Sequence, residues 1–406
     1  MNPGFFPTST LGSKPPQSLI PKCGACGLFK DCGSPKLSPV GEGRKKILII
    51  SESPSGKDDD AGRFLCDSKS SLPLETALRK SGVDILKDCW LTASLICHTN
   101  GERPTNEQVG YCRPNLIKTI KELDPNVIIP LGGNAIQSII PHVWKENIGT
   151  VSRWLGCQIP SQKLNAWICP THSPIYVNHA INNDHMKAKA LKIHLNKHIS
   201  QAVQLCEKPW DTVPDYRKEI VLVREPKKAA HQIRKMIKLG GAVAFDYETD
   251  RIKPDSDESR IVTCSVCWKG KRTIAYPWHG EAITATKELL RSPLPKIGCN
   301  LKFEDRWTRK HMGHRVRNWY WDTMLAAHVI DGRPGVTSLK FQSFVLLGQD
   351  SYDDHIKPYF QSVKGEESNQ IDLVDMDDLL LYNGLDSLLQ YNVAMKQMDL
   401  LEYPRP

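Results

Sequence analysis

The chain has 406 residues, more than one ordinary hydrophobic core needs, which predicts two domains. Apolar residues make up 40% and charged residues 24%, a composition that fits globular proteins and argues against fibrous and disordered classes. No apolar run approaches the ~18 residues of a membrane span, so no membrane partner is expected. The first residues lack the pattern of a secretory signal, which favours a cytoplasmic protein.

Positive charge is concentrated in the first half of the chain. The net charge is +9, and residues 1–205 carry 24 Lys and Arg against 16 Asp and Glu. Residues 206–406 carry 30 against 29. A basic domain beside a near-neutral one favours a polyanionic partner such as DNA.

The order of patterns along the chain predicts two α/β domains. Residues 1–44 are rich in Pro, Gly and Ser, which indicates an irregular lead. Residues 45–205 alternate apolar runs with amphipathic stretches, and Thr105 can cap one of the helices. Prolines interrupt residues 206–217, which are expected to form a linker. Residues 218–406 begin with three strands in close succession and then become mainly helical.

Two carboxylates stand out in the first strand of the triplet. Asp246 and Glu248 lie two residues apart, so both point to the same face of the predicted sheet. A buried pair of this kind needs a cation, although a lone Asp-x-Glu also occurs by chance at exposed strand ends. Near the C-terminus, Tyr382 and Asp386 lie four apart and share one face of a helix.

The ordered set, which also includes NLKFE at 300–304 and DTM at 322–324, resembles the Tyr-type DEDD exonucleases. The resemblance is to the proofreading domain of family A DNA polymerases and covers nearly all of residues 218–400. It implies a ribonuclease H-like (DnaQ-like) fold and hydrolysis of phosphodiesters with two Mg²⁺ or Mn²⁺ ions. It also implies that Asp246 binds both metals, that Glu248 and Asp386 bind the metal that activates water, and that Tyr382 orients that water.

The fourth carboxylate departs from the family pattern. The register from Asn300 puts Glu304 where the family usually has Asp, and Asp305 follows directly. Glu304 is favoured as the ligand, because a helix turns the next residue about 100° away. Asp322 matches a family position that is more often structural than metal-binding.

Thirteen cysteines in a reducing compartment favour a metal or cluster site over disulfides. Cys23 and Cys26 form a CxxC, and Cys97 and Cys112 flank the loop HTNGERPT. Four thiolates suit an iron–sulfur cluster or a zinc ion. Other cysteines are expected to be buried thiols, namely Cys32, Cys66, Cys89, Cys157, Cys169 and Cys206. The strand pair Cys264 and Cys267 is expected to serve packing.

The cysteine spacing, together with ESPSGKDDDAGRF, CHTNGERPTNEQVGYC and CPTHSP, resembles the family 4 uracil-DNA glycosylases over residues 23 to about 180. The resemblance implies a three-layer α/β domain. It also implies a 4Fe-4S cluster held by Cys23, Cys26, Cys97 and Cys112, which is favoured over zinc.

The glycosylase pocket departs from that family at two positions. Ala93 stands where the family has an Asn that reads uracil, and Ser173 stands where it has a His, with His172 one place early. Glu52 and the aromatic Phe64 remain. A glycosylase needs such donors to hold the flipped base and stabilise the departing anion. The losses predict an inactive domain retained for DNA or polymerase binding, unless His172 shifts into the pocket.

The order of the two domains resembles the front of certain bacteriophage family A DNA polymerases. The sequence ends about twenty residues after Asp386, so the polymerase is expected on a separate chain, or the sequence is part of a longer product. The expected function is 3'-5' exonuclease action on single-stranded 3' DNA ends, in a bacterial or phage-infected cell. A bifunctional repair enzyme with active uracil excision is the alternative. The complete carboxylate set argues against a non-catalytic polymerase subunit, and the preference for DNA over RNA and the oligomeric state stay open.

Overall fold

The computed structural model describes residues 23–64, 68–206, 212–362 and 368–406. The chain divides into two compact units, Met1–Thr212 and Val213–Pro406. Residues 1–22 of the predicted lead, the thiol of Cys66 and residues 207–211 of the predicted linker lie outside the described residues. Within the described part, no helix combines the length and apolar character needed to span a membrane.

The first unit is built on a five-stranded sheet with the order β2-β1-β3-β5-β4. Its strands are β1 (Ile47–Ser51), β2 (Cys89–Ala93), β3 (Val127–Pro130), β4 (Ile159–Ser161) and β5 (Ala166–Ile168). Only β4 runs antiparallel to its neighbour. The parallel strands are almost continuously apolar, as strands covered on both faces must be.

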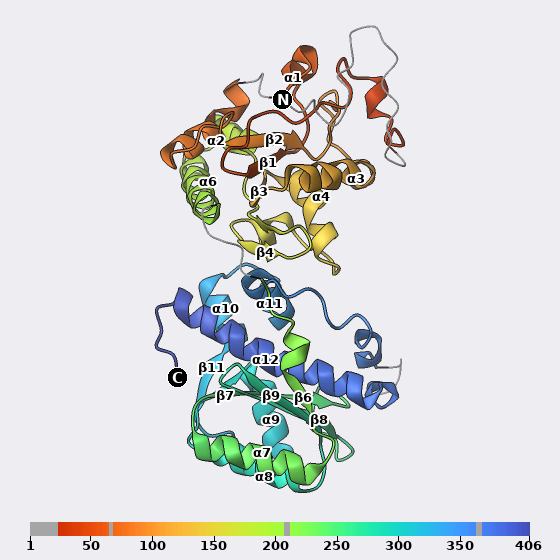
Figure 1. Ribbon diagram of the computed structural model, residues 1–406, viewed down its shortest axis with the longest axis vertical. Helices are drawn as coiled ribbons and strands as arrows, with labels where there is room; N and C mark the ends of the chain where they lie inside the picture. Colours follow the sequence, from red (N-terminus) through yellow and green to blue (C-terminus); the bar gives the residue numbers. More distant parts are fainter. Residues whose placement is uncertain (1–22, 65–67, 207–211, 363–367) are drawn as a thin grey trace. The chain divides into compact units, whose positions relative to one another are not determined.

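Helices cover both faces of this sheet (Figure 1). One layer contains α2 (Ser68–Lys80), α5 (Pro174–Asn183) and α6 (His185–Leu205), and the other contains α3 (Asn106–Leu123) and α4 (Gly133–Val143). The short elements are η1 (Leu28–Lys30), α1 (Gly56–Ala61) and η2 (Val151–Trp154). Thr105 caps α3 by accepting from the Gln108 N–H, and the Gln108 side chain accepts from the Thr105 N–H, which confirms the predicted cap.

The second unit contains a six-stranded sheet with the order β11-β10-β7-β8-β9-β6. Its strands are β6 (Ile220–Leu222), β7 (Val243–Thr249), β8 (Ile261–Trp268), β9 (Arg272–Pro277), β10 (Lys296–Gly298) and β11 (Trp319–Asp322). The predicted triplet is confirmed, since β7, β8 and β9 form an antiparallel meander. β10 pairs with β7 and β11 in parallel, which gives the ribonuclease H-like arrangement expected for this domain.

The helices of the second unit also form two layers (Figure 1). One layer contains α7 (Pro226–Leu239), α8 (Glu281–Arg291) and α9 (Leu301–Met312), and the other contains α10 (Thr323–Ile330), α11 (Leu339–Leu347) and α12 (Met376–Leu400). Three short 3-10 segments complete the unit: η3 (Tyr216–Glu219), η4 (Lys357–Phe360) and η5 (Ile371–Leu373).

Alternation along β7 determines where its acidic residues point. Phe245 and Tyr247 belong to the core under α7 and α8, whereas Ala244 belongs to the core under α12. Asp246 and Glu248 share the parity of Ala244, so they face α12. Both predicted fold classes are therefore observed, each unit being a three-layer α/β domain.

Candidate functional site

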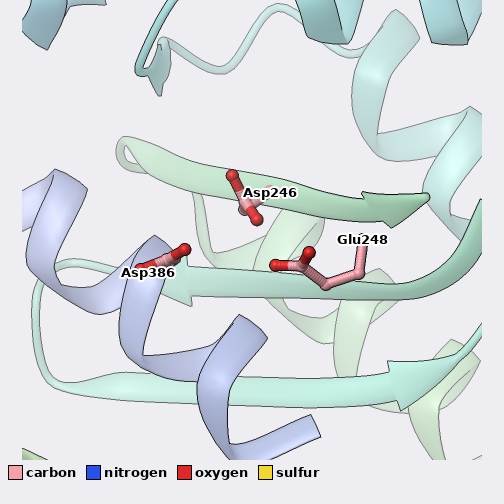
Figure 2. Close-up of side chains that lie close together, drawn as sticks. All are labelled: Asp246, Glu248 and Asp386. Carbon is pink, nitrogen blue, oxygen red and sulfur yellow. The ribbon is translucent and has the colours of Figure 1, made fainter. Parts of the chain in front are cut away.

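Three carboxylates converge between β7 and α12. Asp246 and Glu248 come from the strand and Asp386 from the helix, and one ligand oxygen from each lies within 4.8 Å of the others. Figure 2 shows the three side chains directed toward one another. The structure thus brings together residues that are distant in the sequence, since 140 positions separate Asp246 from Asp386.

The electrostatics of this cluster are unfavourable without a cation. Burial, and then the negative charge of Asp386, raises the pKa of Asp246 to about 8. Burial and the charges of Asp246 and Asp386 also raise the pKa of Glu248. Clustered carboxylates hold either protons or cations, and their hard oxygens suit Mg²⁺ or Mn²⁺. The donor set therefore fits a divalent metal ion.

Two amides hold the Asp246 carboxylate in place. The Nδ2 of Asn383 donates to Oδ2 at 2.8 Å, and the Nε2 of Gln390 donates to Oδ1 at 2.9 Å. Both residues lie on α12, three before and four after Asp386, which places all three on one helical face. Neither amide was predicted from the sequence, although the spacing of both residues from Asp386 could have indicated that they share its helix face.

Glu304 also approaches the cluster. It lies in the first turn of α9, its residue is only 2% exposed, and its Oε2 has no hydrogen-bond partner among the described residues. Burial, and then the charge of Asp246, raises the pKa of Glu304. Asp305 is directed elsewhere: its Oδ1 accepts from the Val316 N–H at 3.1 Å, and its Oδ2 lies 3.7 Å from Nε of Arg315. Asp305 is thus held by partners of its own, whereas Oε2 of Glu304 has none among the described residues.

Asp322 has a structural position. Its carboxylate caps α10 by accepting from the N–H groups of Met324 and Leu325 at 2.9 and 3.2 Å. It also accepts from the N–H groups of Asn300 and Leu301 at 3.1 Å each, where α9 begins. The bonds to Asn300 and Leu301 fix the start of the helix that carries Glu304.

Two tyrosines bind the third carboxylate. Tyr382 forms a hydrogen bond with Asp386, and the hydroxyl of Tyr352 donates to Oδ1 of the same residue. The two buried rings have centroids 5.9 Å apart. Tyr352 was not predicted, because it lies in the loop after α11, where no periodic pattern indicates direction.

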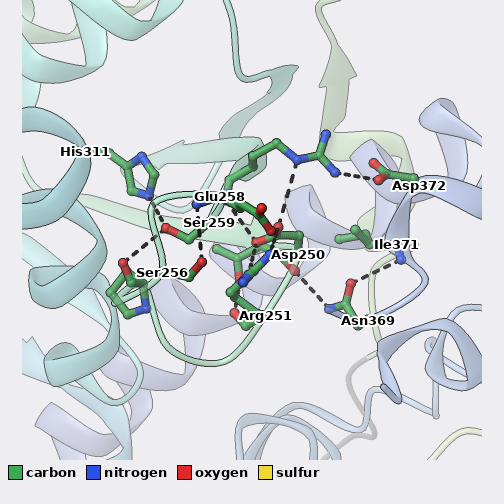
Figure 3. A network of polar contacts seen from close by, with 12 residues as sticks. Asp250, Arg251, Ser256, Glu258, Ser259, His311, Asn369, Ile371 and Asp372 are labelled. Carbon is green, nitrogen blue, oxygen red and sulfur yellow. Dashed lines mark hydrogen bonds and ion pairs between the residues drawn. The ribbon is translucent and has the colours of Figure 1, made fainter. Parts of the chain in front are cut away.

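A polar network fixes the chain just beyond Glu248 (Figure 3). Asp250, 3% exposed, accepts from the N–H of Arg260 at 2.9 Å and pairs with the Arg251 guanidinium at 3.2 Å. Asn369 donates from its N–H to the Asp250 carbonyl at 2.7 Å and from Nδ2 to the Thr249 carbonyl at 3.0 Å. These bonds tie the end of β7 to the segment before α12, so the two elements that carry the cluster are joined.

A pocket lies beside this network. It is lined by Arg251, Ile252, Lys253, Asp255, Ser256, Phe360, Ser362 and Asn369. The Phe360 ring lies 5.4 Å from that of Tyr382, so the pocket adjoins the carboxylate cluster. It combines two cationic side chains with an aromatic and an aliphatic surface.

In the first unit, all four predicted cluster cysteines line one small pocket. Cys23, Cys26, Cys97 and Cys112 share it with Asn115, whose Nδ2 lies 3.7 Å from Sγ of Cys23 and 3.8 Å from that of Cys112. Among the described residues, no three of these thiols come within 4.8 Å of one another. Four thiols around one pocket are a donor set that suits an iron–sulfur cluster or a zinc ion.

A fifth cysteine adjoins this pocket. The thiols of Cys32 and Cys97 are hydrogen-bonded, and Cys97 also accepts from the Lys36 N–H at 3.4 Å. Cys32 and Cys206 are only partly buried, so the expectation of buried thiols is wrong for these two residues. Cys264 and Cys267 are buried in different cores on opposite faces of their sheet.

The glycosylase-like pocket lies at the carboxyl ends of β1 to β3. Its lining includes Pro54, Phe64, Thr92, Leu131 and Pro174. At this edge, Oε1 of Glu52 accepts from the Asn134 N–H at 3.1 Å, in the first turn of α4.

Gly132 allows Glu52 and Ser173 to approach each other. It has a φ of +85°, and a Cβ there would lie 2.8 Å from both Cδ of Glu52 and Cβ of Ser173. Both side chains therefore reach the same edge of the sheet, next to the start of α4.

The two substituted positions carry neither an amide nor an imidazole group. Ala93 is fully buried and packs with Phe64 and Leu37. Ser173 is the buried N-cap residue of α5, and its side chain makes no capping hydrogen bond.

His172 occupies a stack of rings instead of the pocket. Its ring centroid lies 6.3 Å from that of Tyr176 and 6.1 Å from those of His194 and His198. His198 in turn shares a 2.9 Å hydrogen bond with the Thr171 hydroxyl. His172 is therefore packed against α5 and α6.

Solved structures that are similar to part of this chain at low sequence identity include an exoribonuclease. The catalytic core of RRP6 from Trypanosoma brucei is 14% identical with a TM-score of 0.34, covering 47% of this chain and 48% of that one. Escherichia coli RNase D, an exoribonuclease involved in structured RNA processing, is 12% identical with a TM-score of 0.32, covering 45% of each chain. Brucella melitensis NrnC is 17% identical with a TM-score of 0.31, covering 40% of this chain and 74% of that one.

Family models match both units. Residues 38–195 match the uracil DNA glycosylase superfamily, and residues 220–351 match a 3'-5' exonuclease family. The type-4 uracil-DNA glycosylase of Pyrobaculum aerophilum is 36% identical over 117 residues, which are 28% of this chain and 57% of that protein. That of Thermotoga maritima is 28% identical over 124 residues, 30% of this chain and 62% of that protein. The chain thus spans about three fifths of these relatives, and it joins a domain of the uracil-DNA glycosylase superfamily to a 3'-5' exonuclease domain.

Proposed function

We propose that this protein is a metal-dependent 3'-5' exonuclease of the proofreading type that acts on single-stranded 3' ends of DNA. The observation that carries the proposal is the convergence of Asp246, Glu248 and Asp386 within 4.8 Å in the exonuclease domain. The glycosylase-superfamily domain on the same chain supports DNA over RNA as the substrate.

Asp246, Glu248, Glu304 and Asp386 would hold two Mg²⁺ or Mn²⁺ ions. Such ions, when bound, neutralise charge on the phosphodiester and lower the pKa of the attacking water. The chain's own part is to fix the ligands, since amides from α12 hold Asp246 and the hydroxyl of Tyr352 holds Asp386.

Tyr382 orients the attacking water in this proposal. Burial, and then the charges of Asp386 and Glu248, raises the pKa of its hydroxyl. The phenol therefore keeps its proton at neutral pH. It acts as a hydrogen-bonding group that positions the water and does not serve as a base.

The pocket beside Tyr382 suits the end of a single strand. Lys253 offers positive charge to a phosphate, and Phe360 and Ile252 offer apolar surface to a base. A nucleotide placed there would have its phosphodiester next to the carboxylates, because Phe360 contacts Tyr382.

The first domain binds DNA or a polymerase chain without excising uracil, and it holds a 4Fe-4S cluster at Cys23, Cys26, Cys97 and Cys112. The inactivity rests on Ala93 and Ser173, neither of which offers an amide or imidazole donor to a flipped base. The ring stack around His172 supports it, because that packing keeps the imidazole away from the pocket.

A bifunctional repair enzyme is the second candidate. It is favoured by the retained pocket, which Phe64 still lines, and by Glu52 at the start of α4. Uracil excision in this case would need a donor other than the residues at positions 93 and 173.

The primary test is digestion of a 5'-labelled single strand of DNA by the purified chain. A ladder of shortened products in Mg²⁺, and intact substrate in EDTA, is the expected result. A parallel RNA strand of the same sequence tests the substrate preference. Intact DNA in both Mg²⁺ and Mn²⁺ would refute the exonuclease proposal.

A further inference from the structure

We propose that Lys340 supplies a fixed positive charge to the exonuclease site and binds the scissile phosphate, held in position by Asp353. The inference rests on the exonuclease function proposed above and adds a cationic group to its carboxylates. Neither residue belongs to the acidic and tyrosine motifs from which the site was predicted.

Lys340 reaches the site from the start of α11. Ser338 caps this helix by accepting from the Phe341 N–H at 3.3 Å, which places Lys340 in the first turn. Its Nζ pairs with Oδ2 of Asp353 and lies 5.5 Å from the centre of the Tyr382 ring. The ammonium is therefore next to the tyrosine that binds Asp386.

Asp353 is a rigid anchor for this ammonium. Its residue is fully buried, and its Oδ1 accepts from the Ser351 hydroxyl at 3.1 Å. Its carbonyl accepts from the N–H groups of Ile356 and Lys357 at 2.9 and 2.8 Å. A buried carboxylate requires a cationic partner, so Lys340 is constrained to this place.

The residue before Asp353 completes the arrangement. Tyr352 donates its hydroxyl to Asp386, so two consecutive residues fix a metal-binding carboxylate and a cation on the same site. The side chain of Lys340 is 28% exposed, whereas that of Asp353 is 1% exposed. The lysine therefore keeps an accessible side, which a purely structural ion pair does not need.

The position of the charge also matters for the neighbouring carboxylates. Burial raises the pKa values of Glu248 and Asp386, and the ammonium of Lys340 opposes that rise. Its field therefore extends over the cluster. A lysine acts as a compact point charge toward phosphate. It would attract the anionic substrate and repel divalent metal ions.

Removal of Lys340 should therefore weaken catalysis and strengthen metal binding, and these opposite changes make the proposal testable. The variant Lys340→Met with Asp353→Asn removes both charges and leaves no unpaired buried ion. It should lower kcat on single-stranded DNA about tenfold to a hundredfold, the usual cost of removing one group that stabilises the transition state. Mn²⁺ binding measured by calorimetry should become tighter, because the lost ammonium acts on Glu248 and Asp386 more strongly than the lost Asp353 carboxylate does.

The controls separate this role from a structural one. Lys396→Met removes the same charge from an exposed position on α12 and should leave both quantities unchanged. Lys340→Arg should retain Mn²⁺ affinity and part of kcat, since it keeps the charge. Melting temperatures of all variants report on folding.

Each outcome decides the proposal. Lower kcat with tighter Mn²⁺ binding supports it. Unchanged kcat and affinity, or a parallel loss of kcat, affinity and melting temperature, would overturn it by showing that the pair is neutral or only structural. Absence of cleavage by the unmodified chain would instead reject the exonuclease function itself.

Discussion

In the exonuclease unit, acidic side chains from β7 and α12 meet in one cluster, whereas in the glycosylase-like unit the corresponding pocket positions are Ala93 and Ser173. The two cases differ in energetic cost. Clustered carboxylates destabilise a fold unless cations or protons neutralise them, so such a cluster points to a chemical role. A buried alanine or serine costs little stability, so a domain can keep its fold after it loses catalytic side chains.

The largest expected effect is on the exonuclease side of this comparison. Asp246→Ala should abolish Mg²⁺-dependent shortening of 5'-labelled DNA, a loss of about 10³-fold or more, because a ligand shared by two metals cannot be replaced by water. Arg224→Ala, which changes an exposed ion pair with Asp377, is a control that should stay active. Full activity in Asp246→Ala would reject the assigned site.

The cysteine pocket provides the next prediction. The purified chain should absorb broadly near about 400 nm, as thiolate-bound iron–sulfur centres do, and Cys112→Ser should lose that absorption. Cys32→Ser is the matched control, since it removes a neighbouring thiol that is not a proposed ligand. The melting temperature of the first domain should also fall in Cys112→Ser. Colourless protein that contains one zinc ion per chain would contradict the cluster.

A smaller effect distinguishes the two adjacent acids of α9. Glu304→Gln should reduce kcat about a hundredfold, because it removes one charge from the cluster. Asp305→Asn should remain near the unmodified rate, since that carboxylate binds Val316 and not the site. Steady-state rates at saturating Mg²⁺ measure both. The reverse ranking would mean that α9 is rotated by one residue.

The smallest expected change comes from Tyr382→Phe. The variant keeps every proposed metal ligand and loses only a hydroxyl that orients water, so kcat should fall about tenfold to a hundredfold. Its Mn²⁺ affinity should match that of the unmodified chain. Loss of metal binding would show that the tyrosine stabilises Asp386 and does not act on water.

Local spacing was sufficient for some residues of the site. Asp246 and Glu248 share a strand face, and Tyr382 and Asp386 share a helix face, because periods of two and 3.6 residues fix those directions. The helical rotation also separates Glu304 from Asp305: in the structure Asp305 accepts from the Val316 N–H, whereas the charge of Asp246 acts on buried Glu304.

The remaining residues depend on tertiary packing. Tyr352 lies in a loop, and Lys340 lies forty-two residues before Tyr382, so no local period relates them to the carboxylates. The three-residue edge strand β4 was not predicted either, because it is too short to show alternation. The ring stack of His172 depends on how α6 packs, which a motif alignment does not describe.

One assay tests the contrast between the two domains most directly. A 5'-labelled single strand of DNA with an internal uracil is incubated with the unmodified chain in EDTA and, separately, in Mg²⁺, and abasic sites are then cleaved with alkali. We predict shortened products in Mg²⁺ and no alkali-sensitive cleavage at uracil in EDTA. Cleavage at the uracil position in EDTA, or an intact strand in Mg²⁺, would contradict the account.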